Sequence, residues 1–195
     1  MKQKRVVPSP AGPDALWRER HIREFSGSPS SRIGGGWMLI TAGNAAPDGG
    51  GDWNTMTASW GGLGVLWGRD VAFMFIRPSR RTFEFAASAP LFTLSFFDEE
   101  KRAALNFCGK ESGRDHDKAA EAGLSPLVFG GDIAEGKAAG AIAFREARDI
   151  VICRKLYTHD FDPAAFLDKD SIEQSYHGKD YHRMFIGEIL CLLSR

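Results

Sequence analysis

The sequence predicts a β-rich α+β fold, with a closed or partly closed barrel and a few short peripheral helices. Short apolar runs recur between glycine, proline and acidic residues, as strands do. The helical segments are short, and no βαβ alternation or GxGxxG motif after a strand is present, which disfavours a Rossmann domain. The 195 residues suit one domain. We expect residues 1–33 to form an arm or lead-in and 34–195 the main domain.

Four strands are predicted in the first half of the chain, at residues 37–41, 53–60, 71–76 and 92–97. The glycine-rich stretch 46–52 is expected to form the turn between the first two strands, and the glycines within 61–64 to break the second. Residues 71–76 are apolar without interruption, which is typical of a strand buried on both faces.

Helices are predicted where a capping residue precedes a suitable run. Ser79 is expected to cap a helix over 80–87, and Asp98 a helix that Gly109 stops. Asp115 is expected to cap a shorter helix that ends at Gly123.

The two ends of the chain differ in their predicted structure. Residues 14–25 favour a short helix within the proline-rich arm. The C-terminal third returns to strands, at 141–144, 150–157 and 184–193. Residues 161–174 are expected to be irregular, with at most a helical turn.

Composition narrows the function classes. The 25 basic and 25 acidic residues balance to a formal net charge of zero, which argues against a nucleic-acid partner or a membrane-surface partner. The three cysteines are odd in number and form no CxxC motif, so we expect buried thiols in a reducing cytosol, not a disulfide framework or a zinc site. The N-terminus lacks the apolar stretch of a signal peptide, and no run is long enough to span a membrane. A cytoplasmic protein is expected.

An anion site is indicated by five polar donors within six residues, directly after a predicted buried strand. They are Arg77, Ser79, Arg80, Arg81 and Thr82. The first amides of a helix lack intrahelical partners, and the helix dipole is positive there, so this position attracts phosphate. The alternative is a capped helix whose arginines point into water. For the cluster as a whole, anion binding is favoured.

The strand before it offers a second wall. Asn54, Thr55, Thr57 and Ser59 provide small polar groups that could border a flat heterocycle, with Trp60 as a wall or stacking partner. A half-buried strand also commonly carries Thr and Ser on its wet face, so the pattern alone leaves both interpretations open.

Two further segments could reach the same site. The charged loop 110–118 could bring Arg114 and Lys118 over the phosphate, or could be a solvated connector. Lys118 lies in a first helical turn, where a cation opposes the helix dipole unless an anion is near. His182 precedes the last strand and could be a donor or proton shuttle, although a structural role is the commoner one. The histidine spacing indicates no metal site.

Five motifs in order resemble one family. They are Asn-Thr-Met-Thr-Ala-Ser-Trp at 54–60, Ile-Arg-Pro-Ser-Arg-Arg-Thr at 76–82, Phe-Thr-Leu-Ser-Phe-Phe at 92–97, Ser-Gly-Arg-Asp-His-Asp-Lys at 112–118 and Tyr-His-Arg-Met-Phe-Ile-Gly-Glu-Ile at 181–189. Over about residues 36–190 the chain resembles the flavin reductase-like, FMN-binding split-barrel family, its flavoredoxin-type members above all. The resemblance implies an FMN-binding split β-barrel over 34–195, assembled as a homodimer with one FMN per subunit.

The resemblance also implies roles for individual residues. Asn54, Met56 and the segment Thr57, Ala58, Ser59 and Trp60 would line the flavin ring. Arg77, Ser79, Arg80 and Thr82 would hold the ribityl chain and phosphate, which Lys118 and Arg114 would also reach. His182 would sit by the flavin ring or the nicotinamide.

The function that the resemblance implies is an NAD(P)H-dependent flavin or ferric-type reductase. NADH or NADPH would deliver hydride to N5 of FMN, and a small molecule or a protein would accept the electrons. The alternatives are a flavoredoxin-like electron carrier and a non-catalytic flavin-binding module. The chain departs from the family in its glycine-rich loop 44–52, its proline-rich arm before Gly34, and Arg81, where relatives often have an aromatic residue.

Overall fold

The computed structural model describes residues 6–7, 17–46 and 49–195. Its strands form a nine-stranded antiparallel sheet in the order β1-β2-β11-β10-β7-β3-β4, with β6 pairing with both β11 and β5. The strands of this sheet are β1 (Val6–Val7), β2 (Trp17–Arg20), β3 (Met38–Ala45), β4 (Gly51–Ala58), β5 (Gly61–Leu66), β6 (Arg69–Ile76), β7 (Leu91–Phe96), β10 (Asp149–Asp160) and β11 (Arg183–Ser194). A small second sheet pairs β8 (Pro126–Val128) with β9 (Ile142–Phe144). The β-rich class with short helices is confirmed.

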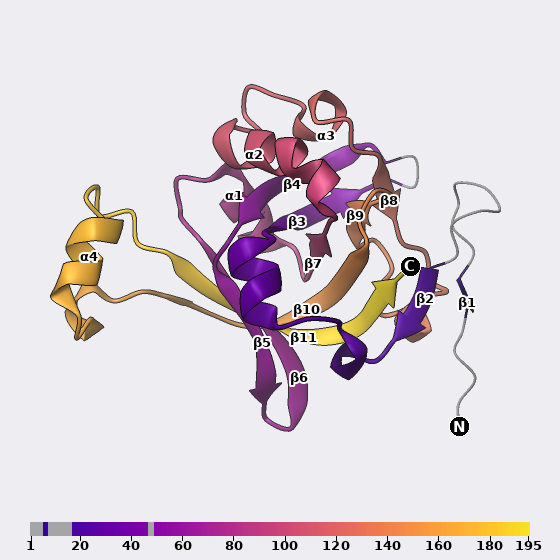
Figure 1. Cartoon of the computed structure of the whole chain (residues 1–195), viewed down its shortest axis with the longest axis horizontal. Coiled ribbons are helices and arrows are strands. Elements are labelled where there is room, and N and C mark those ends of the chain that lie inside the picture. Colours follow the sequence, from indigo (N-terminus) through magenta and orange to yellow (C-terminus); the bar gives the residue numbers. More distant parts are fainter. Residues whose placement is uncertain (1–5, 8–16, 47–48) are drawn as a thin grey trace.

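The sheet is not closed into a barrel within the described residues, so of the two expected forms, closed or partly closed, the closed one was wrong. In this part of the chain β4 pairs only with β3, and β5 pairs only with β6. Strand β11 has two neighbours on one edge. Residues 183–188 pair with β6, and residues 192–194 pair with β2. The consecutive strands β4 and β5 are therefore in different branches of the sheet, and the chain crosses between them at Ser59 and Trp60 (Figure 1).

The predicted hairpin at the start of the sheet is confirmed. Strands β3 and β4 pair along their whole lengths, from Met38 opposite Ala58 to Ala45 opposite Gly51. The turn prediction includes residues 47 and 48, which lie outside the described residues. The glycines expected to break a strand instead build β5. A Cβ on Gly61 would lie 2.8 Å from the carbonyl oxygen of Phe73, so the missing side chain permits close pairing with β6.

Strand β6 matches its predicted position but is not buried on both faces. Val71, Met74 and Ile76 are fully buried, whereas Phe73 and Phe75 are only half-buried. The partly open face matters for function, because Phe75 lines the candidate site.

The three helices predicted over residues 80–123 are confirmed in position, but their caps differ. Helix α1 (Arg81–Ser88) begins after Arg80, because the hydroxyl of Ser79 is bonded to Asp180. Helix α3 (Lys118–Glu121) is capped by Asp117, not Asp115. Its predicted end is confirmed, since Gly123 has a φ of +64°.

Helix α2 (Arg102–Lys110) follows the 3-10 turn Glu99–Lys101 and continues past Gly109. A Cβ on Gly109 would lie 3.2 Å from Cβ of Thr57, so this glycine lets the helix approach β4 and does not stop it. Asp98 precedes the turn as predicted, but its carboxylate accepts a bond from Arg148 at 3.4 Å and does not cap the helix.

The expected helix over 14–25 was wrong in its described part, and residues 14–16 lie outside the described residues. Residues 17–20 form β2, whose backbone pairs with the end of β11, and Trp17 is buried in the core. Tertiary pairing with an available strand edge here overrides local helix preference. The division into an arm (1–33) and a main domain (34–195) stays a prediction.

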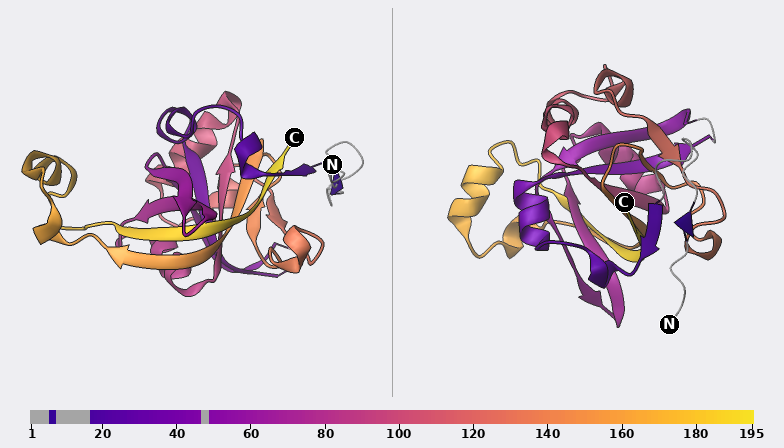
Figure 2. Two further views of the ribbon diagram at one scale, coloured as in Figure 1. Left: turned by 90° about the horizontal axis from the view of Figure 1, so that it is seen from below. Right: turned by 45° about the vertical axis from the view of Figure 1, so that its right-hand side comes forward.

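The C-terminal strands β9, β10 and β11 are confirmed, with β10 and β11 both longer than predicted. Between the last two, residues 161–182 leave the sheet and carry the 3-10 turn Pro163–Ala165 and helix α4 (Lys169–Ser175). Figures 1 and 2 show α4 standing away from the body of the molecule at the end of this segment, which we call the excursion. It is more helical than the irregular stretch predicted.

The core fills three clusters of buried side chains around the sheet. Cys108, Cys153 and Cys191 are all free and buried, so the prediction of buried thiols is confirmed. None of the helices in the described part of the chain is both long and apolar enough to cross a membrane.

Candidate functional site

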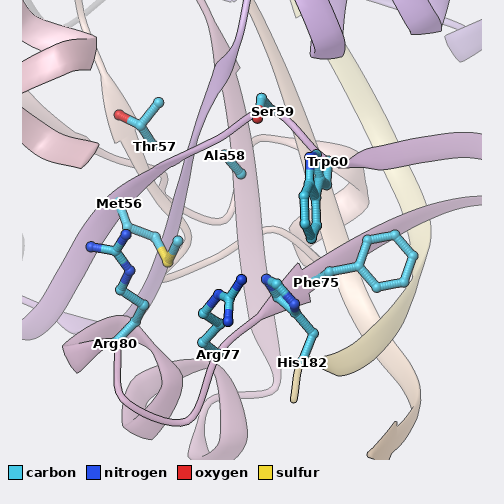
Figure 3. Close-up of a pocket in the computed structure, with 9 residues that line it drawn as sticks. All are labelled: Met56, Thr57, Ala58, Ser59, Trp60, Phe75, Arg77, Arg80 and His182. Carbon is cyan, nitrogen blue, oxygen red and sulfur yellow. The ribbon is translucent and has the colours of Figure 1, made fainter. Parts of the chain in front are cut away.

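Two cavities meet where the chain leaves β4 and β6. The first, of about 200 Å³, we call the strand cavity. It is lined by Met56, Thr57, Ala58, Ser59, Trp60, Phe75, Arg77, Arg80 and His182 (Figure 3). The second, of about 250 Å³, we call the cation cavity. It is lined by Asn54, Met56, Arg77, Ser79, Arg80, Arg81, Thr82, Lys110, Glu111, Ser112, Gly113 and Lys118. Met56, Arg77 and Arg80 line both, so the two cavities are adjacent and share a wall.

Strand β4 forms the shared wall, and its polar side chains are fixed by neighbouring elements. Asn54 is buried and donates from Nδ2 to the hydroxyl of Thr82 at 2.9 Å. Thr57 donates to the carbonyl of Leu105 in α2. These bonds fasten α1 and α2 to the strand, so the wall is rigid before any ligand arrives.

Backbone carbonyls hold two central cations of the cation cavity, Arg80 and Lys118. Arg80 donates to the carbonyl of Gly109 at 2.9 Å. Lys118 is 5% exposed, and its Nζ donates to the carbonyls of Cys108 at 2.7 Å and Glu111 at 3.2 Å. Carbonyl partners position a cation without cancelling its charge. Among the lining residues that the structure describes, five side chains are cationic and one is a carboxylate. Arg81 is paired with Glu84, and Lys110 lies 3.9 Å from Glu111. The other three cations have backbone carbonyls as their hydrogen-bond partners, so an anion is the matching ligand.

Burial of Lys118 affects its ionisation. Desolvation, reinforced by the nearby charge of Arg80, lowers the pKa of Lys118 to about 8. An anion in the cavity would restore the favourable environment that the charged ammonium group has lost. The expected placement of Lys118 in a first helical turn is confirmed.

Arg77 and Ser79 bind the excursion more than they face the cavity. The guanidinium of Arg77 donates to the carbonyls of Ser175 at 2.8 Å and Asp180 at 3.1 Å, and lies 4.9 Å from the ring centre of Tyr176. The amide and hydroxyl of Ser79 both donate to the carboxylate of Asp180. Both residues line the cation cavity as predicted, yet their donors are already engaged.

Two predicted site residues, Thr55 and Arg114, line neither cavity as the described residues define them. Thr55 is buried, and its hydroxyl is bonded to the hydroxyl of Thr41 at 2.9 Å. Arg114 points elsewhere. It donates to the carbonyl of Ser79 at 3.1 Å and to Glu84 at 2.7 Å. Sequence proximity to Lys118 predicted a shared target, but the turn at 113–115 directs the two side chains to different partners.

His182 closes the strand cavity at the other end. It is 8% exposed, and its Nδ1 lies 2.8 Å from the hydroxyl of Tyr176. Its ring centre is 5.0 Å from that of Trp60, and Figure 3 shows both rings bordering the cavity beside Arg77. Desolvation, with the positive charge of Arg77, lowers the pKa of His182 to about 4, so the imidazole is neutral at pH 7.

Some lining residues were missed by sequence reasoning. Phe75 was assigned to a fully buried strand. In the loop 110–118 only Arg114 and Lys118 were predicted to reach the site, whereas Lys110, Glu111, Ser112 and Gly113 also line it. The need for glycine at position 113 is visible only in the structure, because a Cβ there would lie 2.1 Å from Oδ1 of Asn54. Within the described residues, no group of three or more His, Cys, Asp or Glu side chains is arranged to hold a metal.

Solved structures share this fold at low sequence identity. The flavoredoxin of Methanosarcina acetivorans matches with a TM-score of 0.59 and 19% identity, over 82% of this chain and 68% of that one. The flavoredoxin of Desulfovibrio vulgaris (Miyazaki F) gives 0.57 and 19%, over 82% and 69%. A Streptomyces globisporus NADH:FAD oxidoreductase, in complex with NAD and FAD fragments, gives 0.56 and 15%, over 82% and 74%.

No curated protein matches the sequence significantly. The model of the flavin reductase like domain, however, matches residues 30–192, which include every residue that lines the two cavities. The chain belongs to the flavin reductase-like family.

Proposed function

We propose that the protein binds FMN and acts as an NAD(P)H-dependent flavin or ferric-type reductase. The observation that carries the proposal is the adjacency of the two cavities, because a cation-rich cavity shares a wall with one bordered by a strand and three rings. That shape and charge distribution match a molecule with an anionic tail and a flat head.

The cation cavity would receive the phosphate. Arg80 and Lys118 are already positioned by carbonyls, and Thr82 keeps a hydroxyl proton available while it accepts from Asn54. The start of α1 adds amides with the favourable end of the helix dipole. A phosphate bears close to two negative charges at pH 7 and suits such donors.

The strand cavity would receive the ring. Met56 and Ala58 present apolar surface from β4, and the chain segment at Ser59 supplies exposed backbone groups at the strand end. Trp60 and His182 close the far side. FMN would supply hydride acceptance at N5 from NADH or NADPH, followed by electron release to a small molecule or protein.

His182 would act as a neutral hydrogen-bond group. Its low pKa keeps it uncharged across the neutral range, and an Nδ1 that accepts from Tyr176 leaves the proton on Nε2 for donation into the cavity. Hydride transfer needs no protein acid or base, so His182 would orient the bound rings and not supply the transferred atom.

Family membership and the named neighbours support a flavin-related function. The oxidoreductase among them supports the NAD(P)H-dependent reductase, whereas the two flavoredoxins support a second candidate, an electron carrier with bound FMN. We also propose a cytoplasmic homodimer with one FMN per subunit.

Anaerobic titration of FMN-loaded protein with NADH, and separately with NADPH, tests the reductase. We expect the visible absorbance of the bound flavin to bleach with one equivalent of the preferred nicotinamide. Bleaching by dithionite but by neither nicotinamide would reject the reductase and favour the electron carrier. Failure of the protein to bind FMN would reject both.

A further inference from the structure

A third cavity adjoins the strand cavity and shares Ser59, Trp60 and Phe75 with it. We call it the aromatic cavity. Its volume is about 440 Å³, which is sufficient for a small organic molecule. Its other walls come from the turn around Ile33 and from Phe161 and Tyr176 of the excursion.

Four aromatic rings from separate parts of the chain border this cavity. Trp60 is 47% exposed although it adjoins two cavities, so a large apolar surface is left to solvent. Phe75 and Phe161 lie 5.5 Å apart between ring centres, at an interplanar angle of 55°. Tilted faces and edges of this kind form favourable contacts with another flat ring.

The electrostatics of the aromatic cavity contrast with those of the cation cavity. Of the described residues that line it, none carries a charged side chain. Its polar side chains are the hydroxyl groups of Ser30, Ser59 and Tyr176, and the Tyr176 hydroxyl is engaged with His182. A charged ligand would lose hydration here without gaining an ionic partner, whereas a neutral flat ring would not.

We propose that the aromatic cavity binds a neutral, planar aromatic molecule of one or two rings, which shares the site with the cofactor. The inference rests on the proposed function and deepens it, because it assigns a chemical class to the second ligand. The shared wall of Trp60 and Phe75 places that ligand next to the strand cavity. Phe161, which lines the aromatic cavity and not the strand cavity, then determines specificity for it.

Calorimetric titration with two matched probes tests this assignment. Both probes are titrated into FMN-loaded protein at pH 7. At this pH 2-naphthol is neutral, whereas 2-naphthoate has the same two rings and a negative charge. We expect one 2-naphthol site per chain and binding of 2-naphthoate weaker by about tenfold or more, because the carboxylate finds no partner.

Two variants locate the site. Phe161→Ala should weaken 2-naphthol binding by about tenfold, through loss of one ring contact. Leu167→Ala is the matched control, since Leu167 belongs to the same excursion, is 98% exposed and does not line the cavity. It should bind 2-naphthol as the unmodified chain does. If Phe161→Ala does not fold, Phe161→Leu replaces it. The comparison of the two probes on the unmodified chain does not depend on either variant.

Equal affinity for the two probes, or an unchanged affinity in a folded Phe161 variant, would overturn the assignment. A third outcome would also overturn it. If 2-naphthol does not bind and the Phe161 variant sediments differently from the unmodified chain, a second copy of the chain occupies the cavity. FMN loading is read from absorbance before each titration. Loss of FMN binding therefore counts against the proposed function, whereas loss of 2-naphthol binding to FMN-loaded protein counts against this inference alone.

Discussion

The cation cavity and the aromatic cavity flank the strand cavity and are built on opposite principles. In the first, backbone carbonyls hold Arg80 and Lys118 in place and leave their charges uncompensated. In the second, rings such as Phe75 and Phe161 pack against one another, and the lining side chains that the structure describes are uncharged. If the two cavities hold the ligands proposed for them, affinity for the anionic cofactor and selectivity for the neutral ligand should be changed independently, by different residues.

The largest expected effect on FMN affinity comes from substitutions in the cation cavity. Replacing Arg80 by Gln together with Thr82 by Val should weaken FMN binding by about 100-fold, since each hydrogen bond to a charged group contributes about 1.5–3 kcal/mol. Fluorescence quenching of FMN during titration measures the change.

A matched double variant separates site loss from general destabilisation. Arg148→Gln removes an exposed arginine paired with Asp98, and Thr41→Val removes a buried threonine bonded to Thr55 at 2.9 Å. Neither residue lines the cavities. FMN affinity should stay within about twofold of the unmodified chain. An equal loss in both double variants would show that the cation cavity is not the cause.

The next effect tests the geometry of the wall. Gly113→Ala would place a Cβ 2.1 Å from Oδ1 of Asn54, so either the loop or the Asn54 side chain must shift. We expect FMN affinity to fall by about tenfold and the free energy of unfolding to decrease by about 1–3 kcal/mol. Gly131→Ala is the control, because an added Cβ there has no described atom within 4 Å. Identical denaturation midpoints and affinities in the two variants would contradict the packing.

How much of this site could be predicted from sequence differs between its two ends. The donors at 77–82 are close in sequence and follow a strand, so local chemistry predicted their grouping, and the structure brings them to one cavity. The aromatic cavity unites residues near 33, 60, 75, 161 and 176, which no local pattern connects. The sequence pattern placed Phe75 in the core. It also predicted Arg114 as a phosphate ligand, but in the structure Arg114 donates to Glu84 and to the carbonyl of Ser79.

The fold shows the same division. The positions of the strands could be predicted from apolar runs, because a strand that is buried in the core needs consecutive or alternating apolar residues. The open sheet, the branching at β11 and the pairing of Trp17–Arg20 depend on strand edges far away in sequence, which a single sequence does not specify. The cap of α1 was misassigned for the same reason, since Asp180 engages Ser79 from about a hundred residues further along the chain.

In the alkaline range, a pH dependence of FMN binding should arise from the cation cavity. The pKa of Lys118 is lowered to about 8, so the side chain is charged below that pH and becomes neutral above it. A bound phosphate favours the charged form and raises that pKa, so binding takes up protons and FMN affinity should fall as pH rises from about 8 to 9.5. Replacing Lys118 by Met should flatten this decline in FMN titrations at several pH values. A decline of the same steepness in the variant would assign it to another group.

The smallest expected effect concerns the excursion. Asp180→Asn removes a carboxylate that engages the amide and hydroxyl of Ser79 beside the cation cavity. Because an exposed interaction of this kind is worth about 0.2–1 kcal/mol, FMN affinity should rise, by about fivefold at most. Asp162→Asn, at another point of the excursion, serves as the control and should leave affinity unchanged. Weaker FMN binding in the Asp180 variant would show that this contact supports the site and does not compete for its donors.

The most direct test is the ratio of the dissociation constants for riboflavin and FMN in the unmodified protein. The two ligands share the ring and ribityl chain and differ only in the phosphate. If the cation cavity holds that phosphate, FMN should bind at least about 100-fold more tightly, and the ratio should fall by about 100-fold in the Arg80→Gln/Thr82→Val variant. Equal affinities for riboflavin and FMN in the unmodified protein would contradict the account.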